Sequence, residues 1–132
     1  MPQQPSAAVA VLAPQEQMQR IQASLRPDDN VQLFPARTLE AALVAPALVI
    51  VYDADSHHRW PHMLRRILDV RPAARVVLLS RRADSNMWVE ALDAGAYDLL
   101  PKSSAGPEIR SVVLGALSVR YTLTAGATSR EN

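Results

Sequence analysis

The sequence has no cysteine among its 132 residues. This absence excludes disulfide bonds, thiol catalysis and cysteine-ligated zinc. No apolar run approaches the roughly 18 residues that a transmembrane helix needs. The first residues, Met1 to Pro5, also lack the basic start and apolar core of a signal peptide. We therefore predict a cytoplasmic protein that has no membrane partner.

An excess of one charge is also missing, and glycine is scarce. Lysine and arginine number 14 against 13 acidic residues, and there are only 4 glycines. The net charge of +1 supplies no basic field, which argues against a nucleic-acid partner. The segment Ala13 to Glu16 holds no glycine, so it does not form a glycine-rich phosphate loop. We find no paired nucleophile and base and predict that the chain is not an enzyme and has no resident cofactor.

The sequence does contain five apolar runs that alternate with helical patterns. The predicted strands are Ala7–Leu12, Val31–Phe34, Leu48–Tyr52, Val76–Leu79 and Tyr97–Leu100, and the predicted helices are Glu16–Leu25, Thr38–Leu43, Pro61–Val70, Asn86–Ala94 and Pro107–Tyr121. Alternating units of this kind form a parallel sheet with helices on both faces. We predict one α/β domain over residues 7–121, a flavodoxin-like doubly wound sheet of order 2-1-3-4-5, with loose tails at 1–6 and 122–132.

The segment Ala91–Lys102 is the most informative part of the chain. It combines a helix end, a glycine turn at Gly95, a short strand, and a lysine where that strand stops. In this fold the carboxyl ends of strands 1, 3, 4 and 5 meet at one crevice, where α/β proteins bind ligands. The residues predicted to meet there are Ala13, Pro14, Asp53, Ser80 and Lys102.

This pattern resembles the receiver domain of two-component response regulators, where Ala-Gly-Ala-x-Asp-x-Leu-x-Lys is a typical run. The resemblance extends from about Val9 to Val119. It implies that Asp53 is the aspartate phosphorylated by a histidine kinase, and that Ser80 and Lys102 contact the phosphoryl oxygens. It also implies an acidic pair after the first strand that holds Mg²⁺.

The acidic pair is the main departure from the receiver pattern. Met18, Ile21 and Leu25 follow the family's spacing when they are counted from Pro14, so the pair falls on Ala13 and Pro14, whose side chains cannot bind a metal. The chain therefore resembles a pseudo-receiver. We predict signalling through protein–protein contacts, without efficient Mg²⁺-dependent phosphorylation.

Two alternatives remain open at this stage. Asp53 could be a working phosphoacceptor, with Glu16 or Asp55 partly replacing the lost carboxylates; otherwise it is a relic carboxylate paired with Lys102. The second alternative is a small-molecule-binding flavodoxin-like module. Ser80 could instead satisfy a backbone group at its strand end. A metal site at His57, His58 and His62 is disfavoured, because few carboxylates and no cysteine would complete it.

Apolar side chains beside the last strand suggest a partner surface. In the helix Asn86–Ala94 we expect Val89 and Leu92 to face inward, with Met87 and Trp88 adding apolar surface. Leu99, at the family's switch-aromatic position, is assigned to the same surface, and Leu114, Val119 and Tyr121 lie off the buried stripe of the last helix. We predict that a kinase, an output domain or a second copy of the chain docks there.

Overall fold

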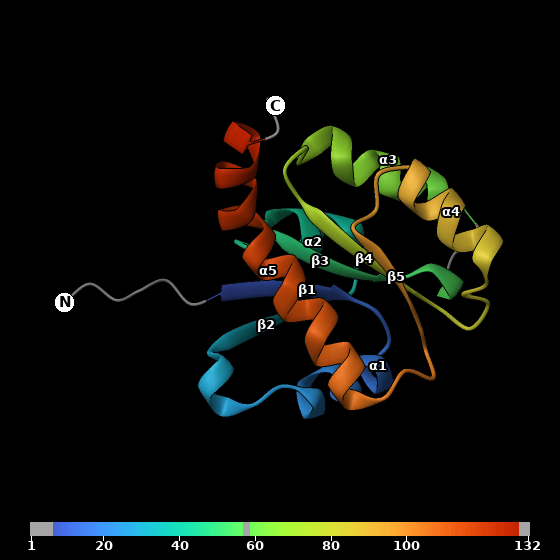
Figure 1. Ribbon diagram of the computed structural model, residues 1–132. Helices are drawn as coiled ribbons and strands as arrows, with labels where there is room; N and C mark the ends of the chain where they lie inside the picture. The colour runs from blue at the N-terminus through green and yellow to red at the C-terminus, as the bar shows by residue number, and fades with distance from the viewer. Residues whose placement is uncertain (1–6, 57–58, 130–132) are drawn as a thin grey trace.

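Five parallel strands form one sheet in the order β2-β1-β3-β4-β5, which confirms the predicted fold class (Figure 1). The computed structural model describes the backbone of residues 7–56 and 59–129, and the side chains within these ranges up to residue 118. The strands are β1 (Ala7–Leu12), β2 (Val31–Ala36), β3 (Val49–Asp53), β4 (Arg75–Ser80) and β5 (Asp98–Pro101). Every residue of β3 is buried, as expected for a central strand covered on both faces.

Helices cover the two faces of the sheet in separate layers (Figure 1). They are α1 (Gln15–Ser24), α2 (Leu39–Val44), α3 (Trp60–Val70), α4 (Ser85–Asp93) and α5 (Gly106–Ser129). Buried residues of α1 and α5 share one apolar cluster with alternate residues of the central strands. Those of α2, α3 and α4 share the other. None of the helices in the described ranges has the length and apolar character needed to cross a membrane.

Two local signals in the sequence act as predicted. The Thr38 side chain accepts a hydrogen bond from the N–H of Ala41 at 3.1 Å, and so caps α2. Gly95 follows α4 with φ of +105°, a backbone conformation that other residues rarely adopt. A β-carbon added there would lie 2.7 Å from Leu68 Cδ1, so the turn is also closely packed against α3.

Several element ends differ from the predicted ones. α5 continues to Ser129, beyond the predicted end at Tyr121, because a sequence of small and polar residues without proline gives it no stop signal. β2 runs through Pro35 to Ala36, which is tolerated because β2 is an edge strand. The other edge strand, β5, also ends on a proline, Pro101. The division into a domain over 7–121 and two tails stays a prediction, and residues 1–6 and 130–132 lie outside the described ranges.

The inward face of α4 was predicted incorrectly. Val89, expected inside, is 59% exposed, whereas Ala91 is fully buried. Met87, expected at the surface, packs partly against the core, one turn before Ala91. The Asp84 side chain caps the start of the helix by accepting from the N–H of Met87 at 2.9 Å.

An ion pair joins α5 to the short turn before β2. Arg110 donates from Nε and from one terminal nitrogen to the two oxygens of Asp29, at 2.9 and 2.7 Å. These bonds, together with one from the N–H of Arg26, lower the pKa of Asp29 from 3.8 to about 2. We call this contact the α5 bridge.

Candidate functional site

The strand register brings the predicted site residues to one edge of the sheet. Leu12 is opposite Tyr52 and Asp53 is opposite Leu79, so the chain after β1 and β4 turns beside Asp53. Ser80 is opposite Pro101, and the N–H of Lys102 donates to the Ser80 carbonyl at 3.0 Å. The predicted meeting of Asp53, Ser80 and Lys102 is therefore present in the structure.

Asp53 and Lys102 form a direct ion pair at the centre of this crevice. The Lys102 ammonium lies 2.8 Å from Oδ1 and 2.9 Å from Oδ2 of Asp53. The Asp53 side chain is 1% exposed and that of Lys102 12%. A buried carboxylate needs such a partner, since taking an unpaired charge out of water is costly.

Asp55, considered from sequence only as a stand-in metal ligand, is an integral member of the site. It lies in the short 3₁₀ turn Ala54–Ser56 after β3. Its carboxylate accepts from the Ser80 hydroxyl and from the N–H of Arg81, both at 2.8 Å, and lies 3.1 Å from the Lys102 ammonium. Its own N–H donates to Oδ1 of Asp53 at 2.9 Å. We call Asp53, Asp55, Ser80 and Lys102 the crevice cluster.

The contacts within the crevice cluster shift the pKa values of Asp55 and Lys102 towards their ionised forms. Burial opposes the charged form of Asp55, but bonds from the Arg81 N–H, the Ser80 hydroxyl and the Lys102 ammonium outweigh it and lower the pKa of Asp55. Burial likewise opposes the Lys102 charge, but the two carboxylates outweigh it and raise the pKa of Lys102. The neighbouring Tyr52 has its pKa raised to about 12, mainly by burial and further by the Asp53 charge.

Ser80 uses its hydroxyl in both directions. It donates to Oδ1 of Asp55 and accepts from the N–H of Arg82 at 2.9 Å. The Ser80 side chain is 1% exposed, so these bonds satisfy a polar group that water barely reaches. Ser80 therefore satisfies a backbone group near its strand end, as the alternative interpretation predicted, and also contacts the carboxylate of Asp55.

The positions of the expected acidic pair carry no charge and serve the start of α1 instead. Pro14 precedes the helix, and its carbonyl accepts from the N–H groups of Gln17 and Met18 at 3.0 and 3.1 Å. Ala13 packs partly against the core. Glu16 points into solvent. Within the described ranges, no three or more histidine or acidic side chains are grouped as a metal site would require.

Of the three histidines considered as a metal site, only His62 lies within the described residues. His57 and His58 lie outside the described residues. His62, on the first turn of α3, is exposed. Trp60, which begins α3, is half-buried and packs against the core while its edge lines the hollow next to Asp55.

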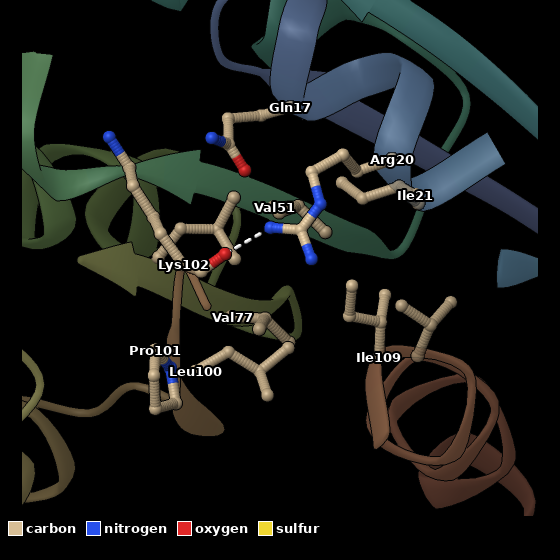
Figure 2. A pocket seen from close by; sticks show the side chains of 11 residues that line it. Gln17, Arg20, Ile21, Val51, Val77, Leu100, Pro101, Lys102 and Ile109 are labelled. Carbon is tan, nitrogen blue, oxygen red and sulfur yellow. Dashed lines mark hydrogen bonds between the residues drawn. The ribbon is translucent and has the colours of Figure 1, made fainter. Parts of the chain in front are cut away.

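An arginine that sequence reasoning missed fixes the loop carrying Lys102. Arg20 of α1 donates to the backbone carbonyl of Lys102, and to that of Ser104 at 2.7 Å. Figure 2 shows the Arg20 guanidinium over the backbone of the loop, with the Lys102 side chain directed away from it. The cavity beneath Arg20 measures about 10 Å³, room for about one water, so it is no ligand site. Arg20 thus positions the main chain that delivers the ammonium to Asp53.

A larger open hollow adjoins the crevice cluster on its other side. It has a volume of about 580 Å³ and is lined by Asp55, Ser80 and the chain that follows β4 into α4. Arg81 and Arg82 line it together with the acidic side chains of Asp84 and Glu90. The hollow leaves part of Asp55, whose side chain is 23% exposed, open to solvent.

The predicted partner surface is only partly exposed. Trp88 on α4 is 46% exposed, as expected for a contact residue. Leu99 is not on the surface: it is 5% exposed and packs in the same cluster as Ala91. Residues of a parallel strand alternate between the sheet faces, and Leu99 faces the layer that α4 covers. Leu114 is half-buried, and the side chains of Val119 and Tyr121 lie outside the described residues.

Solved structures share this architecture, although no family model and no curated protein matches the chain. A response regulator from Thermotoga maritima has a TM-score of 0.76 and 19% identity, covering 86% of this chain and 98% of its own. A response regulator receiver domain protein from Clostridium thermocellum has a TM-score of 0.72 and 19% identity, and the match covers 89% of this chain and 98% of the other. A CheY-like protein from Pseudomonas aeruginosa has a TM-score of 0.67 and 21% identity, and the match covers 84% of this chain and 98% of the other. The chain thus has the fold of the response-regulator receiver domain.

Proposed function

We propose that this chain is a receiver-like signalling module that acts through protein–protein contacts and is not efficiently phosphorylated in a Mg²⁺-dependent reaction. The observation that carries the proposal is the composition of the crevice cluster. Its only cation is Lys102, which lies against Asp53, and no carboxylate stands at Ala13 or Pro14. Mg²⁺ requires near-octahedral oxygen coordination, usually with one or two carboxylates, and here both nearby carboxylates, Asp53 and Asp55, are already paired with Lys102. The residues around Asp53 do not suit it.

The chemistry of aspartyl phosphorylation explains why the missing pair matters. An anionic carboxylate must attack an anionic phosphoryl group, and cations must offset the repulsion. Here Lys102 already interacts with both Asp53 and Asp55. The cluster therefore has a net negative charge, which disfavours an incoming phosphoryl group. On the same grounds we propose no Mg²⁺ cofactor, and we propose no enzymatic activity because the sequence offers no paired nucleophile and base.

Incubation with a small phosphodonor and Mg²⁺, followed by intact-mass measurement, tests the proposal. We expect the wild-type mass to stay unchanged, with Asp53→Asn as the control for modification elsewhere. The double substitution Ala13→Asp/Pro14→Asp restores the acidic pair, and its second aspartate can also cap α1. We expect this variant to gain Mg²⁺ binding and one phosphoryl group on Asp53. Rapid wild-type phosphorylation that Asp53→Asn abolishes would establish the alternative, a working phosphoacceptor.

We propose that the partner surface centres on α4. Trp88 and Val89 are 46% and 59% exposed, and large exposed apolar side chains that adjoin each other commonly mark contact sites. The candidate partners are a histidine kinase, an output domain or a second copy of the chain. Because no phosphorylation switches this surface, a homodimer would form constitutively.

Sedimentation of wild type against Trp88→Glu tests the homodimer. We expect wild type to dimerise at high concentration and Trp88→Glu to be monomeric. Val70→Glu is a matched control, because Val70 is 58% exposed but lies at the end of α3. A monomeric wild type, or equal dimerisation of all three proteins, would show that α4 does not mediate self-association.

A further inference from the structure

Three hydrogen-bond donors from two strand ends converge on the carboxylate of Asp55. They are the Ser80 hydroxyl, the Arg81 N–H and the Lys102 ammonium, at 2.8, 2.8 and 3.1 Å. The hydroxyl and the amide reach different oxygens of the same carboxylate, and the ammonium shares Oδ2 with the amide. A cation, a hydroxyl and a main-chain N–H aimed at one group form a receptor for an oxyanion.

The receptor is built from groups that do not depend on Asp55 for their position. Ser80 ends β4 and is also bonded to the N–H of Arg82. Lys102 is held by Asp53, and its backbone by Arg20 and Ser80. Asp55, by contrast, lies on a short turn outside the sheet. Removing its carboxylate would therefore leave the donors in place.

We propose that the crevice contains an oxyanion-binding site whose resident ligand is the chain's own Asp55 carboxylate. An external tetrahedral oxyanion, with inorganic phosphate as the simplest case, binds there only when this carboxylate is removed. The inference rests on the proposed function and deepens it, because the two side-chain donors are those that the receiver resemblance assigns to the phosphoryl oxygens. Asp55 then keeps the site in an occupied state without any covalent modification.

The neighbouring hollow opens the Ser80 and Arg81 side of the site to a small ion. Its 580 Å³ exceeds the size of a phosphate, and it is lined by both Asp55 and Ser80. In wild type the ion would meet two carboxylates against one ammonium at the cluster. Without Asp55 the Asp53 and Lys102 charges balance, and the donors from Ser80 and Arg81 are unpaired.

Titration with inorganic phosphate at constant ionic strength, followed by calorimetry and thermal shift, tests the inference. We expect Asp55→Ala to bind phosphate at least about tenfold more tightly than wild type, because it frees two or more donors. Asp55→Ala/Ser80→Ala should lose most of this gain. Glu90→Ala is the matched control, because Glu90 lines the same hollow and carries the same charge but contacts none of the donors. Equal gains in Asp55→Ala and Glu90→Ala would overturn the site in favour of general electrostatics. No gain in Asp55→Ala would overturn it outright.

A measurement on the wild-type protein covers the case in which Asp55→Ala does not fold. The amide proton of Arg81 should follow the protonation of Asp55 in an NMR pH titration, and its chemical shift should change at low pH. An Arg81 amide that is insensitive to acid would overturn the contact. The results separate the two proposals. Rapid phosphorylation of Asp53 in wild type would refute the proposed function alone. An Asp55→Ala variant that binds phosphate no more tightly than wild type would refute only the oxyanion site.

Discussion

The crevice cluster and the α5 bridge both join distant parts of the chain through charge, but they match their charges differently. The bridge pairs one guanidinium with one carboxylate in a two-bond geometry, and the side chains of Arg110 and Asp29 are 29% and 6% exposed. The crevice cluster has one ammonium for two carboxylates, and the side chains of Lys102, Asp53 and Asp55 are 12%, 1% and 23% exposed. Since Lys102 is the shared partner of two carboxylates whereas Arg110 can turn to solvent when its single partner is lost, the cluster should be more sensitive to loss of its cation than the bridge.

Replacing the shared cation should have the largest effect. Lys102→Met leaves the carboxylates of Asp53 and Asp55 adjacent and without a counter-ion. We expect the free energy of unfolding to fall by about 3 kcal/mol, as measured by urea denaturation. Lys102→Arg keeps the charge and should recover part of the loss. Equal stability of Lys102→Met and wild type would mean that the cluster does not depend on its cation.

Removing one carboxylate should cost less than removing the cation. In Asp53→Ala the ammonium keeps Asp55 as a partner, so we expect a loss of roughly 1–2 kcal/mol. The double variant Asp53→Ala/Lys102→Ala should lose less than the sum of the two single variants. A coupling of at least about 0.5 kcal/mol in this cycle would support direct pairing, whereas strict additivity would contradict it.

Acid should weaken both regions through their aspartates. A folded-state pKa below the unfolded value stabilises the protein at pH above the unfolded value, and the stabilisation is lost as the pH falls through the folded value. For Asp29 this window lies between 3.8 and about 2, and for Asp55 it lies below 3.8. Unfolding measured across this window should depend less on pH in Asp29→Asn and Asp55→Asn than in wild type. Three parallel pH profiles would show that neither carboxylate is linked to folding.

Breaking the bridge should have the smallest effect and the clearest dependence on salt. Arg110→Met removes a partly solvated pair, so its destabilisation should shrink when salt is raised to about 1 M, where screening extends over only about 3 Å. The loss in Lys102→Met should change less with salt, because Asp53, one of its two partners, is only 1% exposed. Equal salt dependence of the two variants would erase the distinction between the regions.

The sequence allowed the strand order and three members of the crevice cluster to be predicted for one physical reason. Long apolar runs define buried strands, and the residue after each run lies at the carboxyl edge of the sheet. That reasoning places Asp53, Ser80 and Lys102 together. It says nothing about the direction in which the short turn after β3 sends Asp55, because periodicity carries no information on a single turn of chain.

Two other features could not be predicted for related reasons. In α4 the apolar residues spread over more than half of the helix circumference, so the apolar pattern did not single out the buried face. Arg20 had no signal of its own, because a surface arginine and one that binds two loop carbonyls look alike in sequence. The role of such an arginine becomes clear only when the distant carbonyl groups that it binds are known.

The prolines in the two edge strands bear on how this protein can assemble. Pro35 lies in β2 and Pro101 ends β5, the outermost strands of the sheet. A central strand uses its N–H groups in ladders on both sides, and proline has none to contribute, so neither strand is suited to become central by pairing with another chain. Growth by strand addition, the usual route from an open sheet to fibrillar aggregates, is thereby disfavoured at both borders. The helical faces, which include the proposed partner surface on α4, are therefore better suited to association than the sheet edges.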